Sequence, residues 1–204
     1  MTTETRSWIE AVQEYEAELE PVKQRALDAG ASEDMVSYLV RTAAMQRYVH
    51  TVNNRGQKPE GYASFEEFVL AHGQVFEAPP AKKPRPKGFR KGRDKLCFMN
   101  ATHAAFYGDE YHYVEGFAVG GFFPVHHAWV TDAEGNVVET TWKTSGGQYF
   151  GVPFSMNVVG ATIRATNVYG VFNAVLLDQP YDPDSYVERV NEARESGRRP
   201  RYHA

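Results

Sequence analysis

Residues 124–142 read PVHHAWVTDAEGNVVETTW, and this stretch decides the fold of the chain. Valine, threonine and tryptophan, which favour strands, stand on both sides of a short polar segment that contains Gly135. Glycine suits the left-handed position of a three-residue hairpin loop, here 133–135. The stretch therefore predicts two antiparallel strands joined by a tight turn.

The length of this loop also sets the register of the two strands. With a loop over 133–135, Asp132 faces Asn136 and Trp129 faces Glu139. Side chains alternate between the two sides of a strand, so His127 lies on the same side as Trp129 and Glu139. The register thus predicts a histidine and a carboxylate that lie diagonally across one face of the hairpin.

The neighbouring segments extend this hairpin into a mixed fold. CFMNATHAAFYG (97–108) has the length and small residues of a helix that ends at Gly108, whereas YHYVEGFAV (111–119) and YFGVPF (149–154) resemble strands. Ser155 is placed to cap a helix that runs to about Ala165. A helix followed by several antiparallel strands predicts an α+β core.

The first third of the chain is expected to be helical. Apolar residues recur at three- and four-residue steps from Trp8 to about Leu27, with Pro21 placed to bend or divide that helix. Ser32 is suited to cap a second helix, and Ser64 has capping-box spacing to Glu67 at the start of a short third one. We expect residues 1–78 to form a helical cap on the main domain rather than an independent binding module.

A basic segment, 79–95, separates this cap from the core. Its eight Lys and Arg residues against Asp94 give +7, and the chain's net charge of −4 leaves −11 for the rest. We expect a solvated linker, although the basic run 82–95 has the charge to touch an acidic partner or phosphate. No aromatic interleaving or nucleic-acid motif accompanies it, so we expect no nucleic acid as a partner. The domains expected beyond it are an α+β core over 96–179 and a surface helix with a basic tail over 180–204.

Composition excludes several classes of protein. The 204 residues are 42% hydrophobic and 24% charged, which is ordinary for a globular protein, and the single cysteine, Cys97, excludes an internal disulfide. The longest apolar stretch, Gly116–Val125, is short and interrupted by glycine and proline, and the first residues do not resemble a signal peptide. We expect no membrane segment and a reducing cytoplasm, that of the host if the gene is viral.

Cys97 is also the candidate for chemistry. It opens the predicted helix 97–108, where the helix dipole stabilises an anion such as a thiolate. A nucleophilic thiol needs a base, for which His127 is available, and a third group that orients the base, for which Glu139 is placed. This set of three residues requires no metal and no cofactor.

The order of these residues resembles a known family. Cys97, HAW at 127–129 and VVETTW at 137–142 resemble the core of transglutaminase-like cysteine peptidases, with their papain-like set of Cys, His and Asp. The resemblance covers about residues 94–154 and implies that a nucleophile helix packs on an antiparallel sheet. It also implies Cys97 as nucleophile, His127 as general base and acid, and Glu139 in the place of the usual aspartate. The pattern of Cys, YVEG, HAW and YFGV is also similar to a looser set of microbial and phage proteins, which implies no particular substrate.

Three polar residues are secondary candidates for the site. Asn100 lies one turn after Cys97 and is placed either to polarise a carbonyl or to cap and bond the core. Glu115 in YVEG is placed to line the cleft or to remain a carboxylate at the surface of a strand edge. His126 faces away from His127, as a surface residue or as a supporting residue of the site.

Three aromatic residues are placed around the candidate histidine. We interpret Trp129, Trp142 and Tyr149 as core and cleft wall rather than as residues that recognise a substrate.

The leading hypothesis is a cysteine hydrolase that cleaves a peptide, isopeptide or related amide bond through an acyl-enzyme on Cys97. Transfer to an amine or deamidation of glutamine uses the same three residues, and a catalytically silent binding protein stays a further alternative. The remaining alternative is a metal site. Its candidate ligands are His103, His112, His126 or His127 with Asp109 or Glu110. No HExxH or paired-cysteine spacing supports that alternative.

Overall fold

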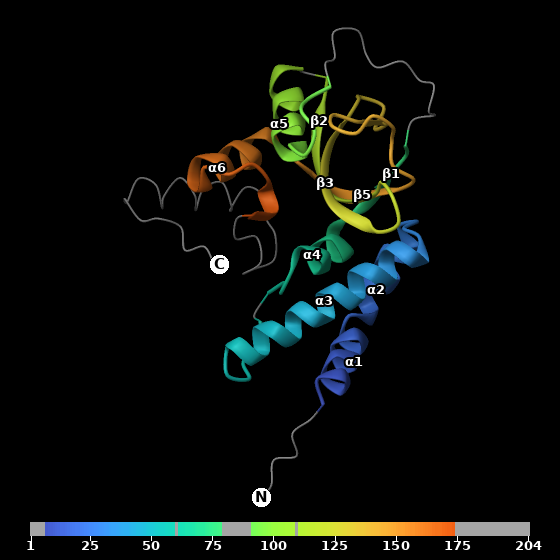
Figure 1. The fold of residues 1–204 in the computed structure, drawn as a ribbon, viewed down its shortest axis with the longest axis vertical. Helices are drawn as coiled ribbons and strands as arrows, with labels where there is room; N and C mark the ends of the chain where they lie inside the picture. The colour runs from blue at the N-terminus through green and yellow to red at the C-terminus, as the bar shows by residue number, and fades with distance from the viewer. Residues whose placement is uncertain (1–6, 60, 79–90, 109, 174–204) are drawn as a thin grey trace, which may run out of the picture. The chain divides into compact units, whose positions relative to one another are not determined.

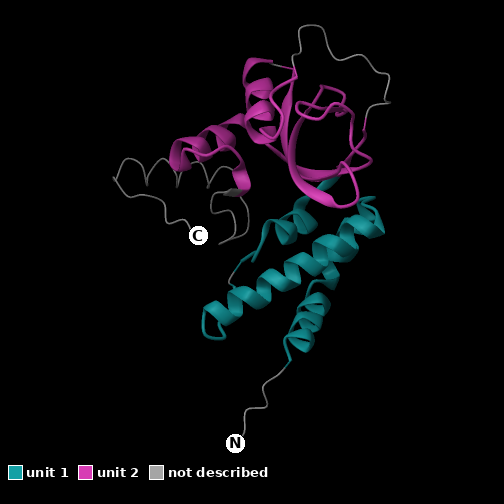
Figure 2. Ribbon diagram, viewed as in Figure 1, with its two compact units in different colours: residues 1–74, 177–179 teal, residues 75–176, 180–204 magenta. Residues whose placement is uncertain are grey.

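A computed structural model describes residues 7–59, 61–78, 91–108 and 110–173 (Figure 1). The chain divides into two compact units, with the boundary between Gln74 and Val75 (Figure 2). Residues 75–78, expected in the helical segment, thus group with the second unit. Most of the basic linker and the predicted tail helix over 180–204 lie outside the described residues. Within the described ranges, no helix is long and apolar enough to cross a membrane.

The first unit consists of helices α1 (Trp8–Glu18), α2 (Glu20–Asp28), α3 (Glu33–Asn53) and α4 (Phe65–His72). The chain breaks between α1 and α2 at Leu19, and Pro21 falls in the first turn of α2, where its missing N–H is not needed. The predicted caps are confirmed: Ser32 accepts a bond from the N–H of Met35, and Ser64 from that of Glu67.

Glu67 has a second role that its capping-box spacing does not predict. Its carboxylate accepts the N–H of Ala63 and pairs with the guanidinium of Arg47 on α3. The side chain of Glu67 is buried. The pair therefore joins α3 to α4 inside the first unit.

The second unit is built on a five-stranded sheet, in the order β1 (Gln74–Phe76), β5 (Tyr149–Phe154), β2 (His112–Val119), β3 (Pro124–Thr131) and β4 (Val137–Val138). The pairs β2–β3, β2–β5 and β3–β4 are antiparallel. Helices α5 (Cys97–Tyr107) and α6 (Met156–Thr166) and a 3-10 turn, η1 (Val171–Asn173), accompany the sheet. The expected α+β class is confirmed.

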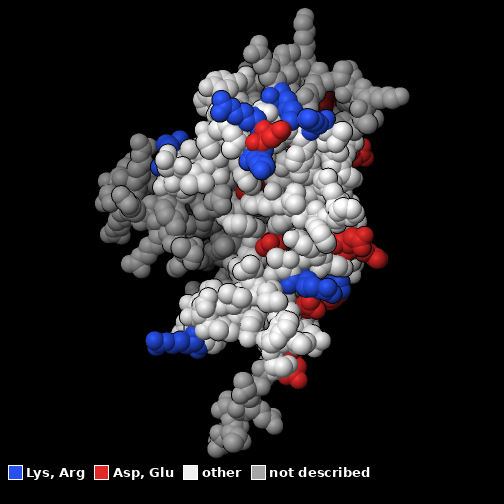
Figure 3. Space-filling view, viewed as in Figure 1, with Lys and Arg blue, Asp and Glu red and all other residues white. Residues whose placement is uncertain are grey.

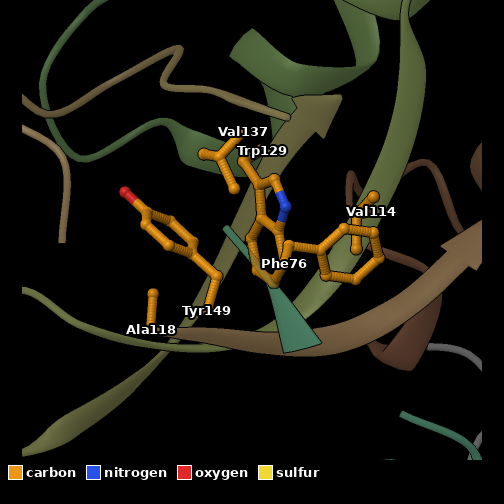
Figure 4. Packing of buried hydrophobic residues seen from close by; sticks show 6 residues of the cluster. All are labelled: Phe76, Val114, Ala118, Trp129, Val137 and Tyr149. Carbon is orange, nitrogen blue, oxygen red and sulfur yellow. The ribbon is translucent and has the colours of Figure 1, made fainter. Parts of the chain in front are cut away.

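The sheet curls until its two edges meet (Figure 1). The N–H of Val137 on β4 donates to the carbonyl of Glu77, one residue after β1, at 3.1 Å. The inner face of the curl holds a cluster of buried apolar side chains (Figure 4): Phe76, Val114, Ala118, Trp129, Val137 and Tyr149. α5 packs against β2 and β3.

The predicted hairpin register is confirmed. Val130 pairs with Val138 and Thr131 with Val137, and the N–H of Asp132 donates to the carbonyl of Asn136 at 3.0 Å. Gly135 adopts a φ of 84°, the left-handed conformation that the loop requires. Continuing this register by one pair brings Glu139 opposite Trp129.

Candidate active site

Cys97 is the first residue of α5 and is partly exposed. Leu96 precedes it at the helix cap, and no side chain caps this end of the helix. The unpaired amides and the dipole of a helix start attract negative charge. The start of α5 therefore presents partial positive charge to the Cys97 side chain.

His127 lies in the middle of β3 with 2% of its surface exposed. Its Nε2 lies 3.1 Å and 3.3 Å from the two carboxylate oxygens of Glu139. The Cys97 side chain also acts on this imidazole and raises the pKa of His127, so the thiol lies close enough to interact with it. One imidazole therefore interacts with both the carboxylate and the thiol.

The surroundings of His127 keep its imidazole protonated at neutral pH. Burial lowers its pKa, but the hydrogen bonds with Cys97 and Glu139, and the charges of both groups, raise the pKa from 6.5 to about 9. A protonated imidazole beside a sulfur stabilises a thiolate. At neutral pH the site therefore presents a cation to the Cys97 side chain.

Glu139 is held by donors other than the histidine. Its Oε1 accepts the backbone N–H of Thr141 at 2.8 Å and of Trp142 at 3.0 Å, and its Oε2 accepts the hydroxyl of Tyr149 at 2.8 Å. Burial raises the pKa of Glu139, but His127 and the two backbone N–H groups lower it by more than burial raises it. The pKa of Glu139 is therefore below its ordinary value. Glu139 is therefore held as an ionised and oriented carboxylate.

Trp142 forms a wall against His127. The two rings stack with centroids 4.0 Å apart and planes inclined by 10°. Two glycines, Gly120 and Gly146, also pack closely on the indole. A Cβ atom added to Gly120 would lie 2.7 Å from the indole, and one added to Gly146 would lie 3.1 Å from it, so neither position has room for a side chain. The imidazole is thus fixed in its plane as well as at its two nitrogens, and a cation on an aromatic face is favourable.

Asn100 links α5 to the segment after Glu139. Its Nδ2 donates to the carbonyl of Arg93 at 2.7 Å and to the hydroxyl of Thr141 at 2.9 Å. The chain before α5 is tied to the same segment, because the N–H of Gly92 donates to the carbonyl of Thr140. These bonds fit the alternative in which Asn100 bonds the core.

Glu115 and His126 belong to the other face of the sheet. Glu115 has no exposed surface and accepts bonds from Tyr113, His126 and the backbone N–H groups of Val171 and Phe172. A surface or cleft-lining position does not fit such a carboxylate, which instead binds η1 to the sheet. His126 faces away from His127, as the alternation of β3 predicts.

Trp129 and Tyr149 are fully buried under the histidine. Trp129 packs edge-on against Tyr149 and Phe76, and its Nε1 has no hydrogen-bond partner among the described residues. Both residues thus belong to the core, but the hydroxyl of Tyr149 also reaches the site through Glu139.

Thr141, Gly120 and Gly146 are site residues that the sequence did not single out. Thr141 binds Glu139 through its backbone N–H, which any residue except proline supplies, and the bond of its hydroxyl with Asn100 joins residues far apart in the sequence, so no signal marks it. The two glycines lie in the GG pairs at 120–121 and 146–147, which are visible in the sequence but whose common neighbour, Trp142, is not.

Three of the four histidines of the metal-site alternative have separate partners. His103 bonds Tyr169, His126 bonds Glu115 and His127 bonds Glu139. In the part of the chain that the structure describes, which omits Asp109, no group of three or more potential ligands is placed to hold a metal ion.

Basic side chains lie close to the start of α5. Figure 3 shows Lys and Arg side chains gathered at the upper end of the second unit, around a smaller number of acidic ones. Lys91 pairs with Asp94 at 2.6 Å just before this helix. The described end of the basic segment thus adds positive charge near Cys97.

Comparison of the chain with family models, with curated proteins and with solved structures gave no match.

Proposed function

We propose that this protein is a thiol-dependent acyl-transfer enzyme, with Cys97 as nucleophile, His127 as general base and acid, and Glu139 as the group that orients the imidazole. The observation that carries the proposal is that one buried imidazole lies 3.1 Å and 3.3 Å from the carboxylate oxygens of Glu139 and also interacts with Cys97, which raises the pKa of His127. A histidine with only a structural role needs neither a thiol nor an oriented carboxylate.

The three residues are sufficient for a balanced reaction. In the starting state we propose, His127 already holds the thiol proton as an imidazolium, and the sulfur attacks the carbonyl carbon of an amide. The C–N bond then breaks, and His127 returns the proton to the leaving amine, which leaves an acyl group on Cys97. Water attacks the thioester, gives a proton to His127 and releases the acid, and the sulfur leaves as the thiolate.

Hydrolysis of a peptide or isopeptide bond is our first choice within this class. Transfer or deamidation follows the same first half and differs only in whether an amine or water takes the acyl group, or in which amide is cleaved. A protein or peptide is therefore the substrate we propose, and a reducing cytoplasm is the compartment in which a lone thiol stays active.

The transglutaminase-like resemblance supports this assignment. The chain order of Cys97, His127 and Glu139, on a helix start and successive strands of an antiparallel hairpin, is the order that the family uses. The departure is the glutamate, which has one more methylene than aspartate. Two backbone N–H groups and the Tyr149 hydroxyl hold the longer side chain in place, so the substitution is compatible with the orienting role.

The test is the rate at which iodoacetamide alkylates Cys97 near neutral pH, followed by mass spectrometry. We expect Cys97 to react at least about tenfold faster than free cysteine, because an imidazolium stabilises the thiolate, and His127→Asn to lose this advantage. Cys97→Ala identifies the modified residue and abolishes any amide hydrolysis. A rate equal to that of free cysteine, with no effect of His127→Asn, would contradict the proposal.

A further inference from the structure

The turn between β2 and β3 presents aromatic side chains to solvent. Phe122 is 98% exposed and Phe123 69% exposed, and Val125, the second residue of β3, is 45% exposed. Adjacent exposed phenylalanines are unfavourable in water unless they contact something. We call residues 120–125 the aromatic tip.

The register of β2 and β3 places the aromatic tip beyond the candidate active site. His127 pairs with Gly116, and the last pair of the hairpin, Val119 with Pro124, lies three pairs further along. At about 3.3 Å per residue, Val125 lies about 7 Å from the histidine along the strand, and the last pair of the hairpin lies about 10 Å from it. Val125 is two residues from His127 on the same strand, so the side chains of both lie on one face.

The aromatic tip is also joined to the site through Trp142. Gly120 contacts the indole ring, which stacks on His127. Val119, directly before the tip, donates its N–H to the carbonyl of Gln148 and accepts the N–H of Gly147. These contacts hold the first residue of the tip, Gly120, against the indole that stacks on His127.

We propose that the aromatic tip binds an apolar side chain of the substrate peptide, two to four residues from the bond that Cys97 attacks. This inference rests on the proposed function, because the reaction brings a peptide to Cys97 and His127. An extended peptide advances about 3.3 Å per residue, so its second residue reaches the level of Val125 and its third the end of the hairpin. The tip is continuous with the site through Val125 and Gly120, which is why we commit to the substrate as its occupant.

The experiment uses peptides that react with Cys97 directly. The thiolate displaces iodide from an iodoacetyl group, so the rate of S–C bond formation reports how well each peptide is positioned. We compare iodoacetyl-Gly-Gly-Phe-amide with iodoacetyl-Gly-Gly-Ser-amide on the full chain. Burial of a phenylalanine side chain predicts a rate at least about tenfold higher for the first peptide. Iodoacetyl-Phe-amide, which is too short to reach the tip, is expected to show no such preference over its serine counterpart.

Two variants locate the source of the preference. Phe122→Ser with Phe123→Ser is expected to reduce the ratio of the two peptide rates to about one, since the apolar contact is gone. Phe106→Ser, which removes a 66% exposed phenylalanine near the other end of α5, keeps the wild-type ratio. Circular dichroism of both variants checks that they are folded.

The outcomes separate this inference from the proposed function. An iodoacetamide rate that depends on His127, together with a peptide ratio near one in the wild type, overturns the inference and leaves the function standing. Loss of the fast iodoacetamide reaction itself overturns both. A dimer in the wild type that the Phe122 and Phe123 variant dissociates would show that the tip contacts a second copy of the chain, which also overturns the inference.

Discussion

Four donors converge on the carboxylate of Glu139: the imidazole of His127, the hydroxyl of Tyr149 and the backbone N–H groups of Thr141 and Trp142. A buried carboxylate without such partners would take up a proton instead of staying ionised. At the scale of single residues, this set of donors keeps a negative charge beside the imidazole. The charge in turn is one cause of the raised pKa of His127.

Glu139→Gln tests this coupling through pH. The pKa of His127 is about 9 instead of 6.5, and removing the carboxylate removes part of what raises it. We expect the alkaline limit of amide hydrolysis, set by loss of the imidazolium proton, to move to lower pH. A pH profile of kcat/KM measures the shift, and an unmoved alkaline limit would contradict the role of Glu139.

The same pKa also predicts how stability depends on pH. Because the folded pKa is raised, the charged imidazole stabilises the fold fully below pH 6.5, and this contribution is lost as the pH rises through about 9. The difference in Tm between wild type and Glu139→Gln should therefore shrink over that interval.

Tyr149→Phe tests the hydroxyl that clamps Glu139. This hydroxyl donates to Glu139 and accepts the buried N–H of Gly146 at 2.8 Å. Its removal leaves that N–H unpaired, so we expect a loss of about 1–3 kcal/mol in the free energy of unfolding. A less oriented Glu139 should also lower kcat with little change in KM.

Chemical denaturation and steady-state kinetics measure the two effects of Tyr149→Phe. Tyr107→Phe is the matched control, because it removes a hydroxyl from an exposed tyrosine on α5. Equal effects of the two substitutions would show that the hydroxyl of Tyr149 does not hold Glu139.

At the scale of elements, Trp142 is fixed between the strand that carries His127 and two backbone segments without side chains. The segments are the turn after β2, at Gly120, and the loop before β5, at Gly146. The loop and the turn are themselves bonded, since Gly147 donates to the carbonyl of Val119 at 2.7 Å. The strand β3, the turn after β2 and the loop before β5 thus determine the position of the indole of Trp142. The indole in turn determines the plane of the imidazole of His127.

Gly120→Ala tests this packing. Its Cβ would lie 2.7 Å from the indole of Trp142, whereas a Cβ at the neighbouring Gly121 would have nothing within 4 Å. We expect Gly120→Ala to displace the indole and to slow alkylation of Cys97, and Gly121→Ala to leave the rate unchanged. Near-ultraviolet circular dichroism and the iodoacetamide rate measure the two effects. Identical rates in both variants would contradict a role of the indole in holding His127.

The elements of the core were predictable because their signals are local. Turn glycine, alternation and loop length together predicted the register that brings Glu139 opposite Trp129. Strand β1 was not predicted, because three residues carry no periodicity and its pairing partner, β5, is distant in the sequence. The division of the first helix at Leu19 was predicted only as a bend or break near Pro21.

At the scale of the whole molecule, the chain forms two compact units, and each has its own buried polar pair. The Arg47 and Glu67 pair lies within the first unit, and the Cys97, His127 and Glu139 set within the second. Because the pair of Arg47 and Glu67 is largely buried, removing one partner leaves the other as a buried charge without compensation. A single buried charge is much less favourable than a buried pair.

Arg47→Ala tests whether the two units are independent. It leaves Glu67 buried without its cation, so we expect the free energy of unfolding of the first unit to fall by about 3–5 kcal/mol. Hydrogen exchange of the α3 and α4 amides measures this loss. Arg41→Ala removes an arginine whose side chain is 83% exposed and should change stability by less than about 1 kcal/mol. We expect the alkylation rate of Cys97 to be the same in both variants, and a loss of reactivity in Arg47→Ala alone would contradict the independence.

The sequence by itself determined the α+β class, the helix that starts at Cys97 and the face shared by His127 and Glu139, because these follow from capping, alternation and one loop length. Only the tertiary structure decided which groups hold that site. The hydroxyl of Tyr149 and the ring of Trp142 reach it through a curled sheet and a loop, and Glu115 became a buried anchor for η1 instead of a surface residue. The physical reason is range: local rules fix how neighbours along a strand are arranged, whereas the meeting of distant segments depends on how the whole sheet closes.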